Sequence, residues 1–211
     1  DGALEELASH DAIFMGAFGD PRVPDMRHAR DILLGTRFRL DLFVNLRPIR
    51  CLHDRLCPLK GRGAADVDFV VFRENTEGLY VGIENYVKVG DDPHAVAQSV
   101  AVVSRTGAER IIRYAFEYAV KNNRKKVTIV HKANILKMVS GLFLEVGRAV
   151  AAEYEGRVAF NDLIIDNAAM QMVLRPEQMD VMVTTNMFGD IPSDLAAGLI
   201  GGPGLAPGGN I

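Results

Sequence analysis

Short, almost wholly apolar runs that alternate with helical patterns constrain the fold of this 211-residue chain more than any other feature. Such runs indicate strands that are buried on both faces. They occupy residues 68–72, 127–130, 163–165 and 180–183. Helical patterns follow three of them, at 106–121, 142–154 and 191–200. This alternation is typical of an α/β fold with a parallel or mixed sheet and flanking helices.

The remaining stretches predict further elements. A buried strand is expected at 12–15, before a glycine-rich loop, and a helix at 26–39. A strand is expected at 41–46, stopped by the proline that follows. The looser pattern of 80–104, with a turn after its first extended part, predicts an excursion of two strands from the main sheet. Residues 106–109 fit a capping box at the start of the next helix.

Composition favours some classes of protein over others. The 24 basic and 27 acidic residues give a net charge of −3, which does not favour a nucleic-acid partner. No window is apolar enough to span a membrane. Cys51 and Cys57 lack the pattern of a disulfide framework or a zinc site, so we expect reduced thiols and a cytoplasmic protein. From the residues at its two ends, Asp1 and Ile211, we expect the chain to be part of a longer protein.

Three carboxylates are candidate metal ligands. Asp190 and Asp194 are four residues apart, which places both on one helical face, and Asp166 follows a different strand. Oxygen ligands with open positions suit Mg²⁺ or Mn²⁺. The spacing alone also fits a helix cap at Asp190 and a solvated Asp194.

Basic residues also follow predicted strands. Arg73 and Arg47 each come after such a run, and Arg37 lies in the helical stretch before them. Guanidinium groups bind carboxylates through paired hydrogen bonds, so three of them suit a di- or tricarboxylic acid, although surface ion pairs remain an alternative for each. Lys132, once desolvated, can serve as a general base with Tyr80 as its acid partner, or both can be packing residues.

Five motifs, in order along the chain, resemble those of the isocitrate, homoisocitrate and isopropylmalate dehydrogenases. They are Asn45-Leu46-Arg47-Pro48, Arg73-Glu74-Asn75-Thr76-Glu77-Gly78-Leu79-Tyr80, His131-Lys132-Ala133-Asn134, Asp166-Asn167-Ala168-Ala169-Met170-Gln171, and the run from Thr185 to Leu195. The resemblance implies an isopropylmalate dehydrogenase-like fold with a β arm for dimerisation. It also implies an NAD-dependent β-decarboxylating dehydrogenase, with NADP not excluded.

The resemblance also implies roles for individual residues. The substrate carboxylates are expected at Arg37, Arg47 and Arg73. A Mg²⁺ or Mn²⁺ ion is expected at Asp190 and Asp194, completed by Asp166 and accompanied by Lys132 from the other subunit of a homodimer. Lys132 would take the hydroxyl proton, and Tyr80 would protonate the product carbon. Asn134 is expected to contact the nicotinamide cofactor.

The resemblance predicts a division of the chain into three parts. Residues 1–42 would belong to the large cofactor-side domain, 43–200 to a central substrate and dimerisation domain, and 201–211 to the return into the large domain. The motifs that would distinguish NAD from NADP are not in this chain.

The resemblance favours 3-isopropylmalate as the hydroxy-dicarboxylate substrate, because isopropylmalate enzymes carry an apolar pocket at the positions of Leu33 and Leu34. Leu33 and Leu34 precede Arg37, and Ile135 could close an alkyl pocket from the partner subunit. Isocitrate, homoisocitrate and tartrate or D-malate dehydrogenases remain alternatives. A non-catalytic regulatory or dimerisation subunit is a further alternative, which the presence of all the expected acids, the lysine and the tyrosine argues against.

Overall fold

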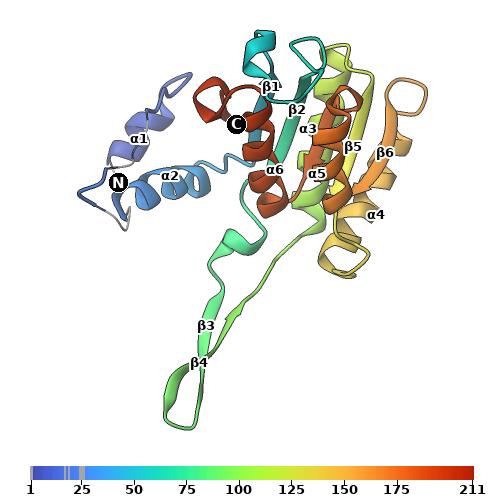
Figure 1. Ribbon diagram of the computed structural model, residues 1–211. Coiled ribbons are helices and arrows are strands. Elements are labelled where there is room, and N and C mark those ends of the chain that lie inside the picture. Colours follow the sequence, from blue (N-terminus) through green and yellow to red (C-terminus); the bar gives the residue numbers. More distant parts are fainter. Residues whose placement is uncertain (1, 17, 19, 24–26) are drawn as a thin grey trace.

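A six-stranded mixed sheet forms the centre of the computed structural model, which describes residues 2–16, 18, 20–23 and 27–211 (Figure 1). Its strand order is β6-β5-β7-β2-β1-β8. The strands span Val44–Arg50 (β1), Asp68–Glu74 (β2), Lys126–His131 (β5), Ala159–Ile164 (β6), Val181–Thr184 (β7) and Gly209–Asn210 (β8). The four strands from β6 to β2 are parallel, whereas β1 is antiparallel to both of its neighbours. The predicted α/β class is therefore confirmed.

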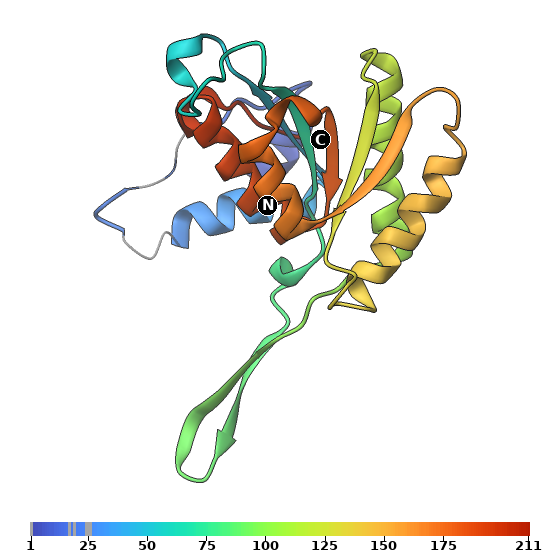
Figure 2. The same cartoon turned by 45° about the vertical axis from the view of Figure 1, so that its right-hand side comes forward.

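Two pairs of helices cover the two faces of this sheet (Figure 2). Helices α3 (Arg105–Lys121) and α4 (Val139–Ala152) contribute to one core cluster, and α5 (Ile165–Leu174) and α6 (Asn186–Leu199) contribute to the other. Strand β2 serves both clusters, because Val70 and Phe72 face one side while Phe69 and Val71 face the other. Burial on both faces explains why the run at 68–72 is continuous rather than alternating.

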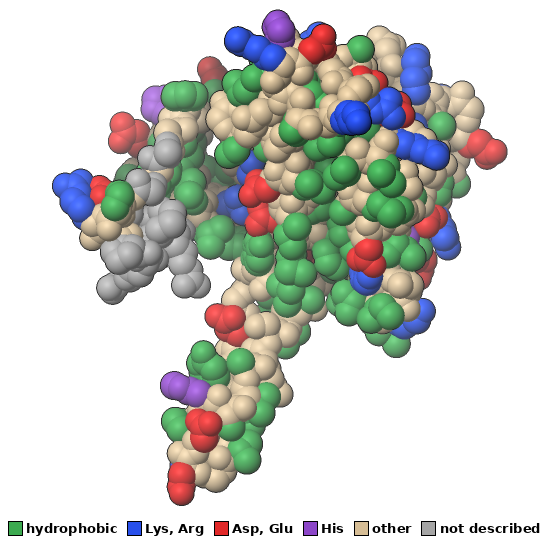
Figure 3. Space-filling model, in the orientation of Figure 1, with side chains coloured by type: hydrophobic (Ala, Val, Ile, Leu, Met, Phe, Trp, Pro, Cys, Tyr) green, Lys and Arg blue, Asp and Glu red, His purple; other side chains and the backbone are tan. Residues whose placement is uncertain are grey.

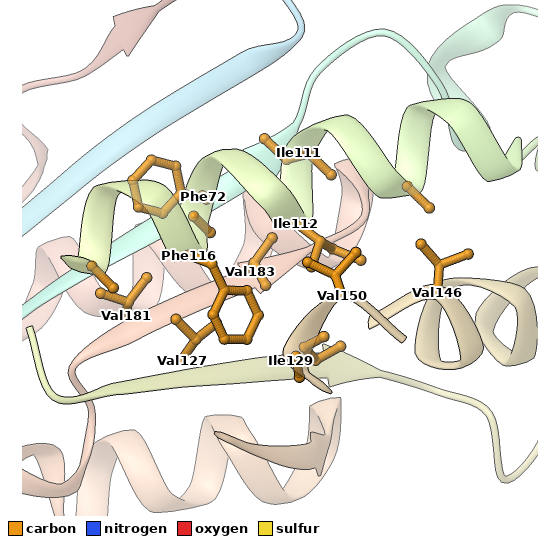
Figure 4. Packing of buried hydrophobic residues seen from close by; sticks show 14 of the residues in the cluster. Phe72, Ile111, Ile112, Phe116, Val127, Ile129, Val146, Val150, Val181 and Val183 are labelled. Carbon is orange, nitrogen blue, oxygen red and sulfur yellow. The ribbon is translucent and has the colours of Figure 1, made fainter. Parts of the chain in front are cut away.

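Helix α3 shows how the sequence pattern becomes packing. Its predicted apolar face is fully buried, and it comprises Ala108, Ile111, Ile112, Ala115, Phe116 and Ala119. Figure 4 shows Ile112 and Phe116 directed towards the valines and isoleucine of the sheet. This cluster fixes α3 across the strands whose ends carry the candidate site.

A long hairpin, which we call the arm, leaves the body of the molecule (Figure 1). It consists of β3 (Glu84–Val89) and β4 (Asp92–Ser99), and every residue of both strands is exposed. The turn between them contains Gly90 at φ 60°, a conformation that favours glycine. The predicted two-stranded excursion is thus confirmed.

Two further helices and four short 3₁₀ turns complete the described chain. Helices α1 (Gly2–Ala8) and α2 (Arg27–Arg39) lie to one side of the sheet (Figure 1). The turns are η1 (Asp54–Leu56), η2 (Leu79–Val81), η3 (Pro176–Gln178) and η4 (Pro203–Leu205). Within the described ranges, no helix is both long and apolar enough to cross a membrane.

The predicted strand at 12–15 is wrong. These residues form no strand, and the side chain of Phe14 is fully exposed. An apolar run becomes a strand only where a neighbouring strand accepts and donates its hydrogen bonds, and none of the described strands lies there. The glycine-rich loop predicted after it, and the helix start predicted at Met26, lie partly outside the described residues.

The predicted stop of the next strand at Pro48 is also wrong, because β1 continues through it to Arg50. Pro48 is opposite Val70, whose N–H donates to Asp180 on the far side of β2. The pair is therefore not hydrogen-bonded across the two strands, and a proline N–H is not needed there. On its other side β1 pairs with β8 only at Asn45 and Leu46, so Pro48 lies at an open edge.

At α3, α5 and α6 the structure differs from the prediction at the start of the helix. Helix α3 is capped by Ser104 rather than by a box beginning at Thr106: the Ser104 hydroxyl accepts from Gly107 N at 2.9 Å. Helix α5 begins at Ile165, so Asp166 lies in its first turn rather than at the end of a strand. Helix α6 begins at Asn186, which places Asp190 inside the helix and removes its alternative role as a cap.

Candidate active site

Arg73 and Asp190 form the centre of the candidate site. Arg73 lies near the end of β2 and is almost fully buried, and its Nη1 forms an ion pair with Asp190 of α6. Its Nε donates to Asn186 Oδ1 at 2.8 Å. Gly189 allows this close approach, because a Cβ at that position would lie 2.5 Å from Arg73 Cβ. The start of α6 is therefore packed directly against the end of β2.

Tyr80 joins this pair from the root of the arm. Its hydroxyl donates to Asp190 Oδ2 at 2.8 Å, and the Arg73 guanidinium carbon lies 5.4 Å from the ring centroid. Burial raises the pKa of Tyr80, and the hydrogen bond to Asp190 raises it further. Tyr80 therefore keeps its proton and its hydrogen bond to Asp190 at neutral pH, and its role as a general acid stays a prediction.

Arg37 and Arg47 surround the same centre with positive charge. Burial, followed by the charge of Arg73, lowers the pKa of Arg37 to about 10. The Nε atom of Arg37 is buried and has no hydrogen-bond partner among the residues that the structure describes. Arg47 donates from Nε to Asn45 Oδ1 at 2.8 Å. A buried donor without a partner beside other cations indicates a place for an anion.

An asparagine network that the sequence analysis did not predict supports Arg47. Asn75 Nδ2 donates to Asn210 Oδ1 at 2.9 Å and to Leu42 O at 2.8 Å. Asn45 Nδ2 donates to Asn75 Oδ1 at 3.2 Å. The network joins β1, β2 and β8. Its signal in the sequence was that Asn45 and Asn75 both lie within the recognised motifs.

Glu77 links the arm to the body, a role that the sequence analysis also missed. Its carboxylate accepts from Ser104 N at 2.8 Å and from the Ser104 hydroxyl, so it ties the start of the arm to the cap of α3. Its carbonyl oxygen accepts from Asn186 Nδ2 at 2.9 Å. Gly78 and Val102 add two backbone hydrogen bonds between the arm's two roots. Asn186 therefore binds both Arg73 and the segment that leads into the arm.

Lys132 and Asp166 form a separate group. Lys132 follows β5, and its Nζ forms an ion pair with Asp166. Asp166 lies in the first turn of α5, where the helix dipole favours a carboxylate. Among the described residues, neither Lys132 nor Asp166 forms a hydrogen bond or ion pair with Asp190. The structure therefore divides the predicted catalytic residues into two groups within one chain.

The predicted metal ligands are divided in the same way. Asp190 and Asp194 lie one turn apart on α6, and Asp194 is exposed. Among the described residues, no three His, Cys, Asp or Glu side chains are gathered closely enough to hold a metal ion. Two carboxylates on one helical face fit part of a Mg²⁺ or Mn²⁺ site, and further oxygen ligands are needed to complete it.

The predicted pocket and cofactor residues lie on α2 and on the loop that follows β5. Leu33 is exposed on α2, one turn before Arg37, and Leu34 beside it is half-buried. Asn134 and Ile135 are exposed on the loop that follows Lys132. Each of them is close in sequence to Arg37 or to Lys132, and its role stays a prediction.

Known proteins are similar to this chain in both sequence and fold. The homoisocitrate dehydrogenase of Methanocaldococcus jannaschii is 42% identical over the whole chain, which covers 60% of that protein. The 3-isopropylmalate dehydrogenase of Nocardia farcinica is 48% identical over the whole chain and 62% of its own length. The chain therefore spans about 60% of the length of these relatives.

A solved structure gives the same result. The isocitrate dehydrogenase of Methylococcus capsulatus matches with a TM-score of 0.84 and 47% identity, over the whole chain and 59% of that protein. The family described as isocitrate/isopropylmalate dehydrogenase matches residues 1–211. The resemblance predicted from the five motifs is confirmed, and the chain belongs to the isocitrate/isopropylmalate dehydrogenase family.

Proposed function

We propose that the full-length protein is a metal-dependent dehydrogenase that oxidises and decarboxylates a malate-type 2-hydroxy acid, with 3-isopropylmalate as the preferred candidate. The observation that carries this proposal is the cluster of three arginines around Asp190 and Tyr80. Arg37 has a buried Nε without a partner and a pKa lowered by burial and by Arg73. The carboxylates of a dicarboxylic acid would supply the missing acceptors and neutralise the repulsion.

In this proposal, different side chains hold the substrate, accept a proton and donate a proton. Arg37, Arg47 and Arg73 would hold the substrate carboxylates and so fix its hydroxyl and its reacting carbon. Lys132 would accept the hydroxyl proton. Tyr80 would donate a proton to the carbon that has lost CO₂.

The carboxylates of α6 and α5 supply the hard oxygen donors that a divalent ion requires. Asp190 and Asp194 would hold Mg²⁺ or Mn²⁺ together with Asp166 from a second copy of the chain. A bound ion would polarise the substrate hydroxyl and carboxylate, and NAD or NADP, contacted by Asn134, would accept the hydride. The predicted domain boundaries at residues 42 and 200 are part of this proposal.

A homodimer with shared sites accounts for the separation of the two catalytic groups. In the part of the chain that the structure describes, Lys132 and Asp166 form no hydrogen bond or ion pair with the Asp190 cluster, so a second chain would be needed to bring the two groups together. Exposed apolar residues offer surfaces for that chain: Tyr86, Val89 and Val96 on the arm, and Met170, Val173, Leu174, Ile191 and Leu195 on α5 and α6. Figure 3 shows hydrophobic side chains gathered on that face of the body and along the arm.

The preference for 3-isopropylmalate rests on Leu33 and Leu34. Leu33 lies four residues before Arg37 on α2, so an alkyl group of a substrate held by Arg37 would meet an apolar side chain. Ile135 would approach from the second copy. An apolar pocket distinguishes substrates by only about 1–3 kcal/mol per methylene group, so related hydroxy acids remain close competitors.

Turnover of the purified full-length protein tests the proposal. We expect reduction of NAD or NADP with 3-isopropylmalate, and weaker activity with isocitrate, homoisocitrate, tartrate and D-malate. Leu33→Ser should lower kcat/KM for 3-isopropylmalate selectively, whereas Leu52→Ser, at an exposed leucine outside the predicted pocket, should not. Activity on isocitrate alone would contradict the isopropylmalate assignment. A cytoplasmic location also stays a prediction.

A regulatory subunit is the second candidate. The relative named as regulatory subunit 2 of the mitochondrial NAD isocitrate dehydrogenase of Arabidopsis thaliana is 43% identical over the whole chain. The dehydrogenase proposal predicts that Mg²⁺ stabilises the intact protein when a hydroxy acid is present. Absence of both this stabilisation and any turnover would favour the regulatory role.

A further inference from the structure

His131, the residue before Lys132, is buried and makes two hydrogen bonds through its ring. Its Nδ1 accepts from the backbone N–H of Ala133 at 3.0 Å, and its Nε2 lies 3.1 Å from Asp162 Oδ2. A backbone N–H can only donate, so Nδ1 must be the unprotonated nitrogen. The ring therefore carries its hydrogen on Nε2 and donates it to Asp162.

Asp162 is itself fixed on the edge strand β6. Its second oxygen, Oδ1, accepts from Arg148 Nη2 of α4 at 3.1 Å. Burial acts to raise the pKa of Asp162, but the hydrogen bonds from His131 and Arg148 outweigh it and lower the pKa overall. Asp162 is thus a carboxylate that accepts from His131 and so selects its tautomer.

These contacts fix the backbone on both sides of Lys132. Before it, Val130 O accepts from the Thr184 hydroxyl at 2.8 Å. After it, His131 Nδ1 holds the N–H of Ala133. The carbonyl of Lys132 accepts from Leu136 N at 2.9 Å. The direction in which the lysine side chain leaves the end of β5 is therefore set by the short segment that His131 anchors.

We propose that His131 and Asp162 are positioning residues for Lys132. Asp162 sets the tautomer of His131, and His131 Nδ1 holds the Ala133 amide, which aims Lys132 at the hydroxyl of the substrate. The inference rests on the proposed role of Lys132 as the base. It gives His131 a positioning role, whereas a histidine at such a place in a sequence is more often only a structural residue.

Two substitutions of His131 separate its two hydrogen bonds in the full-length protein. In His131→Asn the side-chain oxygen lies near the position of Nδ1 and can still accept from Ala133. In His131→Gln the amide lies near the position of Nε2 and can still reach Asp162, but the Ala133 contact is lost. We expect His131→Asn to keep most of the wild-type kcat. We expect His131→Gln to lower kcat roughly 10- to 100-fold, because a misplaced catalytic group costs about that much.

The KM for the hydroxy acid should change little in both variants, because the arginine cluster is untouched. Equal losses of kcat in the two variants, or a larger loss in His131→Asn, would overturn the proposal. A loss confined to KM would overturn it too, since it would place His131 in substrate binding.

Hydrogen exchange of the Ala133 amide gives a readout that does not depend on turnover. We expect slow exchange in the wild type and in His131→Asn, and fast exchange in His131→Gln. Equally fast exchange in all three proteins would overturn the anchoring of Ala133. Absence of turnover on every hydroxy acid would instead count against the proposed function, while the exchange pattern would still decide whether His131 holds the segment.

Asp162→Ala tests the proposal where the buried His131 variants do not fold. Removing the acceptor should speed exchange at Ala133 and lower kcat in the same direction as His131→Gln. Arg148→Gln is the matched control, because it removes the other partner of Asp162 and leaves the histidine contact in place. Equal effects of the Asp162 and Arg148 variants on the Ala133 amide would overturn the role of Asp162.

Discussion

Arg37→Met is predicted to stabilise the protein in the absence of substrate. The Nε atom of Arg37 is buried without a hydrogen-bond partner, and burial together with the charge of Arg73 lowers its pKa to about 10. A buried donor without a partner costs about 1–3 kcal/mol. Methionine keeps an unbranched apolar side chain without the charge. We expect a gain of about 1 kcal/mol, at the lower end because Arg37 is only half-buried and solvent screens part of the repulsion.

The pH dependence of this gain follows from the direction of the shift. Because folding lowers the pKa of Arg37 from its ordinary value to about 10, the unfolded chain binds more protons than the folded chain above pH 10. The penalty is complete below pH 10 and is relieved as the pH rises through 10. The advantage of Arg37→Met should therefore be constant from neutral pH to about pH 9 and should shrink above pH 10.

Urea unfolding of the two proteins provides the assay, with Arg50→Met at the exposed end of β1 as a control of equal charge change. A saturating malate-type dicarboxylate with Mg²⁺ should reverse the order, because ligand at a hundredfold excess over Kd adds about 2.7 kcal/mol to a protein that binds it. Lower stability of Arg37→Met without ligand, or equal stabilisation of both proteins by the ligand, would refute the reasoning.

Three further predictions follow from the packing around the site. Asp190→Asn should destabilise the protein by about 1–2 kcal/mol in urea unfolding, which is less than the loss of a fully buried pair because the carboxylate is partly exposed. Asp194→Asn should change the stability by no more than about 0.5 kcal/mol, and equal stabilities of the two variants would contradict the ion-pair argument. Both variants should lose the stabilisation by Mg²⁺ and substrate. Gly189→Ala should lower the free energy of unfolding by about 1–3 kcal/mol in thermal unfolding, because its Cβ would overlap the arginine of β2. Gly198→Ala on the same helix has open space for a Cβ and should be neutral or stabilising. Similar melting temperatures of the two variants would argue against the close contact. Glu77→Ala should lower stability by about 1–2 kcal/mol and speed exchange of the amide that its carboxylate holds at the start of α3; an unchanged amide would show that the cap does not depend on it.

The fold could be predicted where a segment carries its own signal. The run at 68–72 is apolar at each position after the first because β2 is buried on both faces, and α3 was predicted because its apolar residues recur with the helical period. The run at 12–15 looked the same but forms no strand, because strand formation depends on a neighbour that local sequence does not specify. Pro48 was misjudged for the related reason that its missing N–H matters only where a partner strand would use it.

The site could be predicted as a set of residues but not as an arrangement. Arg73 and Asp190 are 117 positions apart, and their ion pair exists because α6 begins where β7 ends, beside β2. Asp166 was predicted to complete the metal site from the partner subunit together with Lys132, and within one chain these two residues form an ion pair that the sequence did not indicate. Glu77 carried no separate signal because its partner, Ser104, lies beyond the whole arm.

The sequence by itself determined the alternation of strands and helices, the arm and the family, because each is encoded in local periodicity or in contiguous motifs. Only the tertiary structure decided which charges meet, which nitrogen of His131 carries the hydrogen and where β1 ends. The physical reason is that hydrogen bonds and ion pairs act over a few ångströms in space, and the sequence does not state which distant residues the packing of helices on the sheet brings within that range.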